Sequence, residues 1–421
     1  MVKCMPDGNA SEHGDEIVSI DLGVSRRNLM KQMSAVGIAG GLSALAGCGG
    51  LRSDSQTPTE SADGESGDGS GGQSDGGGGS DSLPTALRVP LVPPPTADSM
   101  DLANPTHEER EMVFVTHVVD EFMTGIIVGM NDALNNVGWS GEFIGPSSHD
   151  PAQQIETLNT TISRLNNGED AIATSILNKD QYTGPIQNAI DNDIPVASFN
   201  TSVYSGQYSE MMDTFGTVIP YVGQKFVEAG VAVGQTGYEI AREKVDGEIV
   251  ALPTTSAPGH PALSARAEGI RMALEAQDDV RVLSTLNVSG DLSQAINRVD
   301  TKYSATPDLN LILGTALQGA IAGGRLVENN SLQDEMTVGG FDLPGPTLDG
   351  IEKGTIDFTA GQDPYSQGNM PVNMMWNYME RGIPMKDFNT GISIIDESNL
   401  EFARRRSGSW GDLQSWQDNN Y

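Results

Sequence analysis

The chain has 421 residues, which suits two or three domains at about 150 residues each. Its 57 acidic side chains against 24 basic ones give a formal net charge of −33 at pH 7, which excludes a nucleic-acid partner held through its phosphates. Because the acidic residues are spread over the chain and Lys is scarce, we interpret the composition as adaptation to molar salt, which screens charge repulsion. An ordinary acidic surface is the alternative interpretation.

The N-terminal segment has the features of an export signal. A pair of arginines lies within Ser25 to Lys31, and an uncharged stretch follows from residue 33 to 47. This order predicts a signal peptide over residues 1–47 that resembles the twin-arginine type. Residues 45–48, Leu-Ala-Gly-Cys, resemble a lipobox, so Cys48 is the expected lipid attachment site on the outer face of the cell membrane. A short buried helix is the alternative.

A linker is expected next. Residues 53–87 contain no Lys or Arg and are dominated by Gly, Ser and Asp from residue 64 to 80, so we expect a disordered linker over residues 48–88 that begins at the lipid-anchored cysteine. Beyond the signal segment no run of about 18 apolar residues follows, so the body should be soluble. Both cysteines, Cys4 and Cys48, precede the body, which excludes a disulfide or cysteine metal site within it.

From residue 111 onward, short apolar strands alternate with amphipathic helices. This alternation predicts βαβ units and parallel sheets, hence an α/β fold of two Rossmann-like lobes. The first half predicts strands 112–116, 142–146, 171–174 and 194–199 with helices 122–137, 151–166 and 182–191. The second half predicts helices 221–236, 261–276, 292–303 and 317–328 with strands 248–252, 280–286, 309–313 and 337–341.

The alternation repeats after residue 216, which predicts two lobes side by side. We expect an N-terminal lobe (N-lobe) of residues 109–215 plus 363–390, a C-terminal lobe (C-lobe) of 216–362 plus 391–405, and a tail of 406–421. The chain would then cross between the lobes near residues 214–217, near 362 and near 389–393, which makes a three-strand hinge. Ligands of such sheets bind at the carboxyl ends of the strands, so a shared crevice is the expected site.

Six short segments resemble, in order, the type I periplasmic binding proteins for simple sugars, the ribose- and galactose-binding group, over residues 111–400. They are Asp120–Met123, Asp191–Asn200, Ser264–Ile270, Thr337–Asp342, Gly350–Gly354 and Phe358–Gly368. Each segment alone is weak evidence for the family, whereas six segments in this order and at suitable spacing are specific to it. Together with the acidic composition, the resemblance suggests a haloarchaeal member of this group.

The resemblance implies a set of ligand-binding residues: Asp120, Phe122, Met123 and Asn200 on the N-lobe, Ser264, Thr315 and Asp342 on the C-lobe, and Gln362 at the hinge. Carboxylates and amides can bind pairs of sugar hydroxyls, and an aromatic ring can cover the apolar face of the sugar. The alternative for each polar residue is a helix cap or turn contact.

The sequence departs from the family at several of these positions. Asn200 stands where many sugar binders have Asp, while Thr201 and Ser264 stand where ribose-type proteins have Arg. His260 is either a replacement ligand contact or a surface residue. Arg266 is expected to be structural, pairing with a carboxylate at the start of its helix.

The implied function is an extracytoplasmic solute-binding protein that captures a pentose or hexose and delivers it to an ABC import permease with its ATPase. We expect a monomer without cofactor or metal. Enzyme activity is not expected, because the chain has no His-Glu-x-x-His motif, no phosphate-binding Gly-rich loop ending in Gly-Lys-Ser/Thr, and no Gly-x-Ser-x-Gly turn between a strand and a helix. Alternatives are a binding protein for a nucleoside or other small polar solute, a ligand sensor that docks on a chemoreceptor, and an exported hydrolase.

Overall fold

The structure, a computed structural model, describes residues 92–95, 100 and 109–409. These residues belong to one compact unit. The predicted signal peptide, Cys48 and the predicted linker up to residue 88 lie outside the described residues, as does the end of the chain from residue 410.

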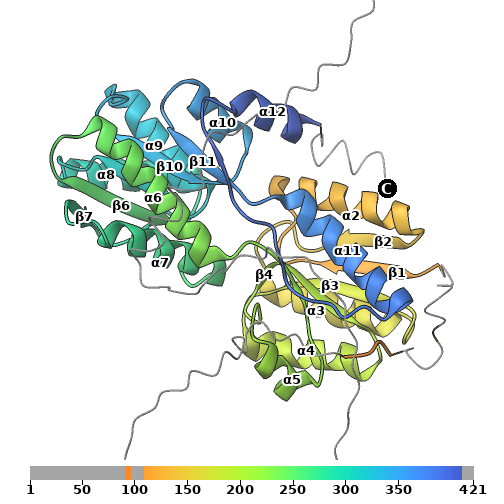
Figure 1. The fold of residues 1–421 in the computed structure, drawn as a ribbon. Coiled ribbons are helices and arrows are strands. Elements are labelled where there is room, and N and C mark those ends of the chain that lie inside the picture. The colour runs from red at the N-terminus through yellow and green to blue at the C-terminus, as the bar shows by residue number, and fades with distance from the viewer. Residues whose placement is uncertain (1–91, 96–99, 101–108, 410–421) are drawn as a thin grey trace, which may run out of the picture. The chain divides into compact units, whose positions relative to one another are not determined.

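The N-lobe is built on a six-stranded parallel sheet with strand order β12-β5-β4-β3-β1-β2 (Figure 1). Its strands are β1 (Glu111–Val115), β2 (Ser140–Ile144), β3 (Ala171–Ile176), β4 (Val196–Ser202), β5 (Tyr221–Gly223) and β12 (Phe388–Asn389). The short helix η3 (Glu121–Met123) leads into α2 (Thr124–Val137), which packs with α11 (Pro364–Arg381) on one face. The other face carries α3 (Pro151–Arg164), α4 (Lys179–Asp191) and α5 (Tyr208–Phe215).

The C-lobe repeats this plan on a seven-stranded sheet with order β13-β11-β10-β9-β6-β7, in which β8 also pairs with β6 and only β13 is antiparallel to its neighbour. Its strands are β6 (Ile249–Thr255), β7 (Val280–Val282), β8 (Leu286–Asn287), β9 (Leu311–Gly314), β10 (Thr337–Phe341), β11 (Phe358–Gly361) and β13 (Ser393–Ile395). Helices α6 (Phe226–Lys244) and α7 (Pro261–Glu275) pack on one face, and α8 (Leu292–Ala305), α9 (Leu317–Asn330), α10 (Gly345–Glu352) and α12 (Leu400–Gly408) on the other.

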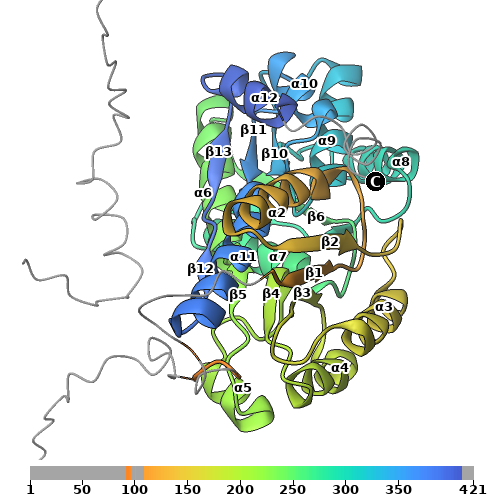
Figure 2. The ribbon, with the colours of Figure 1, turned by 90° about the vertical axis from the view of Figure 1, so that its right-hand side faces the viewer.

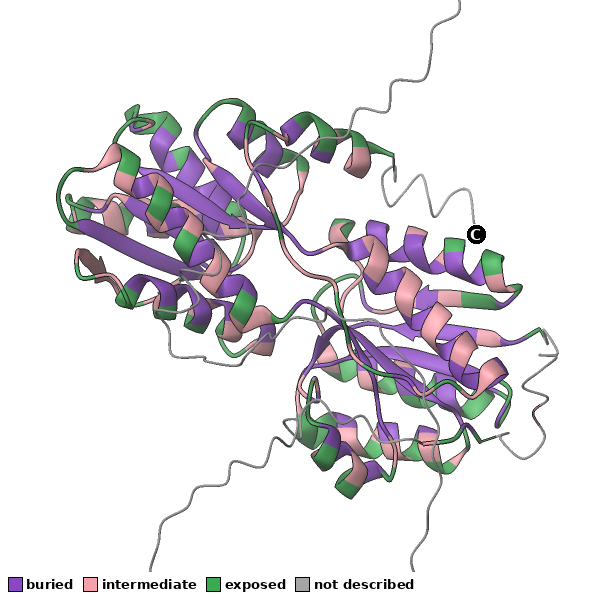
Figure 3. Cartoon of the chain, viewed as in Figure 1, coloured by how far each residue is buried: buried purple, intermediate pink, exposed green. Residues whose placement is uncertain are grey.

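Strand side chains alternate between the two faces of each sheet, and both faces are covered. In β1, Met112 and Phe114 pack with α2 and α11, whereas Val113 and Val115 pack with α3 and α4. All four are fully buried, and Figure 3 shows the central strands of both lobes as buried. This double burial explains why the strands appear in the sequence as continuous apolar runs.

The chain passes between the lobes three times, after β5, after β11 and after β12 (Figures 1 and 2). The second and third passages agree with the prediction. The first was predicted at residues 214–217 and lies later, because Tyr221–Gly223 forms β5 between β4 and β12 instead of starting a helix. The N-lobe therefore extends to Gly223, and the following helix begins at Phe226. The predicted start of the tail at residue 406 was also wrong, because helix α12 of the C-lobe extends to Gly408.

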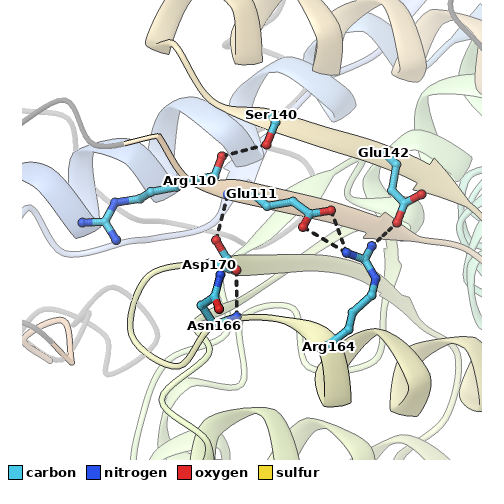
Figure 4. A network of polar contacts seen from close by, with 7 residues as sticks. All are labelled: Arg110, Glu111, Ser140, Glu142, Arg164, Asn166 and Asp170. Carbon is cyan, nitrogen blue, oxygen red and sulfur yellow. Dashed lines mark hydrogen bonds and ion pairs between the residues drawn. The ribbon is translucent and has the colours of Figure 1, made fainter.

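Polar contacts tie the amino-terminal ends of the first strands together (Figure 4). Arg164, in the last turn of α3, donates to both Glu111 on β1, at 2.8 and 2.9 Å, and Glu142 on β2. Asp170 accepts from the backbone N–H of Glu111 at 2.9 Å and of Asn166 at 2.7 Å. These contacts anchor the end of the sheet opposite to the carboxyl ends of the strands, where ligands of such folds bind.

Helices α2 and α11 pack closely enough that only glycine fits at their contact. A Cβ atom at Gly368 would lie 1.8 Å from the carbonyl oxygen of Ile126, and one at Gly129 would lie 2.0 Å from the carbonyl oxygen of Tyr365. Since α2 follows Asp120 and Phe122 directly while α11 follows Gln362, this contact brings the two candidate binding segments together.

Candidate ligand-binding site

A cavity of about 300 Å³ lies between the lobes, and we call it the interlobe cavity. Residues from three parts of the chain line it. They are Asp120, Glu121, Phe122, Thr124 and Gly125 of the N-lobe; Leu317, Asp342, Leu343, Pro344 and Ser407 of the C-lobe; and Gly361, Gln362 and Pro364 at the second passage. Both lobes therefore contribute walls, and the volume is at the lower end of the range for small-molecule sites.

Four of the eight predicted ligand-binding residues meet in this cavity: Asp120, Phe122, Asp342 and Gln362. Their elements are far apart in the sequence but end at the same crevice, as expected for carboxyl ends of parallel strands.

The other four predicted residues lie elsewhere. Met123 packs in the N-lobe core with an exposed fraction of 2%, because the η3 turn directs it inward. Asn200 is buried at the end of β4 and is not among the residues lining the cavity. Thr315 is fully buried, and its carbonyl oxygen accepts a hydrogen bond from Arg266 at 3.1 Å. Ser264 is exposed and lines a different hollow.

That second hollow, of about 780 Å³, lies on the C-lobe alone. Helix α7 and the loops after β6 and β7 line it, including Ser264, Arg271 and the exposed Met272. A site that responds to lobe closure needs contacts from both lobes, so the smaller interlobe cavity is the better candidate.

Three acidic residues line the interlobe cavity: Asp120, Glu121 and Asp342. Asp342 follows β10 in a left-handed conformation with φ of 74°. Burial raises the pKa of its carboxyl, while the charge of Arg266 and a hydrogen bond from Gln362 act in the opposite direction. The protein around the cavity partly desolvates Asp120, and the charge of Asp342 adds to this effect, so the pKa of Asp120 is raised as well. Such carboxylates are strong acceptors for ligand hydroxyls.

A chain of side-chain amides runs from Asp342 into the N-lobe. Gln362 donates from Nε2 to Asp342 Oδ1 at 2.7 Å. Gln367, in the first turn of α11, donates from Nε2 to the carbonyl oxygen of Gln362 at 2.9 Å, and Asn200 donates from Nδ2 to Gln367 Oε1 at 3.1 Å. Sequence reasoning assigned no role to Gln367, although it lies in the quoted segment 358–368.

Arg266 differs from its expected role. It is buried, with an exposed fraction of 3%, and donates to Gln224 Oε1 at 2.9 Å and to the carbonyl oxygen of Thr315. Its guanidinium lies 4.0 Å from the ring centroid of Phe341. No carboxylate accepts a hydrogen bond from it in the described part of the chain, so the predicted pairing was wrong. Burial lowers the pKa of Arg266, and the nearby Asp342 partly opposes this.

Three histidines from both lobes gather at the carboxyl ends of the strands. The ring centroid of His117, just after β1, lies 5.1 Å from that of His149 and 5.7 Å from that of His260, which precedes α7. His117 Nδ1 is 2.9 Å from the hydroxyl of Ser175. His260 is thus neither a plain surface residue nor part of the interlobe cavity lining. Within residues 109–409 no group of histidines, cysteines and acids has the arrangement of a metal site.

Two open α/β lobes, three passages between them and a polar cavity walled by both define a bilobal solute-binding protein. The chain belongs to the family described as periplasmic binding protein domain, whose model matches residues 112–383. Members of this family are solute-binding proteins. None of the helices in the described ranges combines the length and apolar character needed to span a membrane.

Comparisons with individual proteins agree with this assignment. The chain is 25% identical over 329 residues to the xylose/arabinose-binding protein XylF of Sulfolobus acidocaldarius, covering 76% of this chain and 79% of that protein. The glucose-galactose binding protein GanP of Geobacillus stearothermophilus superposes with a TM-score of 0.61 at 23% identity, over 70% of this chain and 99% of that one. An ABC transporter solute-binding protein of Burkholderia graminis in complex with D-arabinose superposes with a TM-score of 0.61 at 22% identity, over 70% of this chain and 96% of that one.

Proposed function

We propose that this protein is an extracytoplasmic solute-binding protein that captures a simple sugar, a pentose or hexose, and delivers it to an ABC import permease. The observation that carries the proposal is the interlobe cavity itself, which is lined by Asp120, Asp342 and Gln362 together with Phe122. Carboxylates and an amide suit the hydroxyls of a sugar, and the phenyl ring suits its apolar face. The resemblance to a xylose/arabinose-binding protein supports a sugar of this size.

Capture would work by closure of the lobes. A ligand that contacts residues of both lobes stabilises the form in which the lobes are close, and it can shift the equilibrium only by its differential affinity for that form. The three passages between the lobes allow a hinge rotation. The permease would then recognise surfaces that are brought together only in the ligand-bound form.

Export and anchoring belong to the same proposal. The twin-arginine-type signal over residues 1–47 would deliver the chain outside, and Cys48 would carry the lipid. Residues 48–88 would tether the monomeric body to the membrane with freedom to reach the permease. The charge of −33 would keep the body soluble in molar salt.

A binding role without catalysis is preferred over hydrolysis. The acids of the interlobe cavity are explained as acceptors for hydroxyls, and the family consists of solute-binding proteins. No cofactor is needed for this role.

A thermal-shift screen of the purified chain in molar salt tests the proposal. Xylose, arabinose, glucose, galactose and myo-inositol would be compared with nucleosides and amino acids, since a ligand that binds the native state raises the unfolding midpoint. We expect a rise with a pentose or hexose and recovery of the sugar unchanged by chromatography. A rise only with nucleosides or amino acids would reject the sugar, and conversion of the sugar would reject the binding-only role.

A further inference from the structure

Gln367 is buried completely although its carboxamide is polar. It donates to the carbonyl oxygen of Gln362 at 2.9 Å and lies 3.4 Å from Gln362 Oε1, and it accepts from Asn200 at 3.1 Å. It is not among the residues lining the interlobe cavity. A buried amide whose hydrogen bonds all go to other amides and to the hinge backbone is costly to disturb, because any partner left unpaired keeps its desolvation penalty.

Each amide is held in one orientation by its neighbours on both sides. An ionised carboxylate only accepts, so Gln362 must present its NH₂ group to Asp342 Oδ1. The oxygen of Gln362 then faces the NH₂ group of Gln367, and the oxygen of Gln367 faces the NH₂ group of Asn200. Thr201 completes the series by donating to Asn200 Oδ1 at 3.2 Å.

The series connects both lobes through the hinge. Asp342 belongs to the C-lobe, Gln362 to the second passage, and Gln367 and Asn200 to the N-lobe. The close contact of α2 with α11 holds Gln367 in place, since the glycine next to it, Gly368, allows the helices to touch.

We propose that Gln367 is a positioning residue for ligand capture: it fixes the amide orientation of Gln362 against Asp342 and holds the hinge at the second passage in the geometry that the interlobe cavity requires. Its function as a positioning residue for capture rests on the proposed function, whereas its effect on the Asp342–Gln362 pair does not.

The first experiment needs no ligand. Gln367→Met keeps the length of the side chain and removes its hydrogen bonds, and Asn369→Leu, which removes a 3.2 Å bond from the same helix to Gly129, is the matched control. In ¹³C-carboxyl NMR titrations, Gln367→Met should raise the pKa of Asp342, because Gln362 then donates less firmly to the carboxylate. Asn369→Leu should leave that pKa unchanged. An unchanged titration in a folded Gln367→Met protein, or equal shifts in both variants, overturns the proposal.

The second experiment measures sugar affinity by calorimetry, with D-xylose and L-arabinose as probes. The measurements form a double-mutant cycle of wild type, Gln367→Met, Asp342→Asn and the double variant. The cycle tests the coupling between two residues that Gln362 links. We expect the two substitutions to be non-additive by at least about fivefold in Kd. Additive effects overturn the role in capture. A shifted Asp342 titration without binding of either sugar keeps the positioning role and rejects these sugars as cargo.

Discussion

His117 of the N-lobe and His260 of the C-lobe lie with their ring centroids 5.7 Å apart, and His149 lies within 5.8 Å of both. Burial, with the neighbouring imidazoles, lowers the pKa of His117 to about 3, and burial lowers that of His260 to about 4. His149 adds to both effects, and the charge of Arg266 also acts on His260. These two imidazoles are therefore neutral in the native protein at pH 7, and the lobes meet there without a charge conflict.

This arrangement predicts that acid destabilises the fold. In the unfolded chain a histidine binds its proton below about pH 6.5, whereas native His117 does so only near pH 3, so stability should fall between these values as pH falls. At pH 5.5 the loss from His117 alone would be about 1 kcal/mol. Urea unfolding at pH 7.5 and 5.5 measures it.

His117→Gln is the control for this prediction, since it removes the titrating ring. The pKa values of Asp120, Asp342 and Asp387 are raised in the native state, so these carboxyls make the protein more stable as the pH falls. Only the difference between wild type and variant therefore isolates the contribution of the histidine. An equal loss of stability in wild type and variant contradicts the prediction.

Substitution of the polar cavity residues should weaken sugar binding. Asp342→Ala or Gln362→Ala removes one partner of a 2.7 Å hydrogen bond at the interlobe cavity as well as a ligand contact, so we expect Kd to rise at least about tenfold in calorimetry. Ser264→Ala is the matched control, because Ser264 lies in the second hollow and should leave Kd within about twofold of wild type. An equal increase in Kd for the Ser264→Ala and Asp342→Ala variants would show that the sugar does not bind in the interlobe cavity.

The affinity for sugar should depend on pH. Ligand hydroxyls favour the ionised carboxylates, and the pKa values of Asp120 and Asp342 are raised in the free protein. Binding should therefore weaken as pH falls, beginning at a higher pH than an ordinary aspartate would cause. Calorimetry at several pH values between 7.5 and 5 measures this dependence. The Asp342→Asn variant should show a smaller pH dependence of Kd. An equal pH dependence in wild type and variant would show that other groups cause it.

Two helical glycines should respond oppositely to alanine. At Gly368 the new methyl group would meet the carbonyl oxygen of Ile126, so α2 and α11 must separate, at a cost of about 1–3 kcal/mol. At Gly184, exposed in the middle of α4, nothing lies within 4 Å, and Ala should stabilise the protein by about 0.5–1 kcal/mol. Thermal unfolding of both variants checks this pair, and destabilisation at Gly184 would show that helix α4 is held differently.

Much of the site follows from local sequence. Asp342 follows directly on the predicted strand 337–341, and Asp120 lies in the turn between the predicted strand 112–116 and the helix that starts at Phe122. Gln362 was identified only through the segment 358–368 that resembles the family, and the structure shows that it follows a strand, as ligand contacts in parallel sheets do. Met123 was misplaced because one residue along a tight turn changes the direction of a side chain from cavity to core.

The sequence by itself determined the two α/β lobes, because the burial of strand and helix faces leaves a local periodic pattern. The hinge near residue 362 and four residues lining the interlobe cavity were implied by short segments that resemble the sugar-binding family. Only the tertiary structure decided that β5 belongs to the N-lobe, that Gln367 links Asn200 to Gln362, and that His117 meets His260. These contacts join residues far apart in the chain, and their partners are chosen by the packing of whole elements, such as α2 against α11, which no local pattern records.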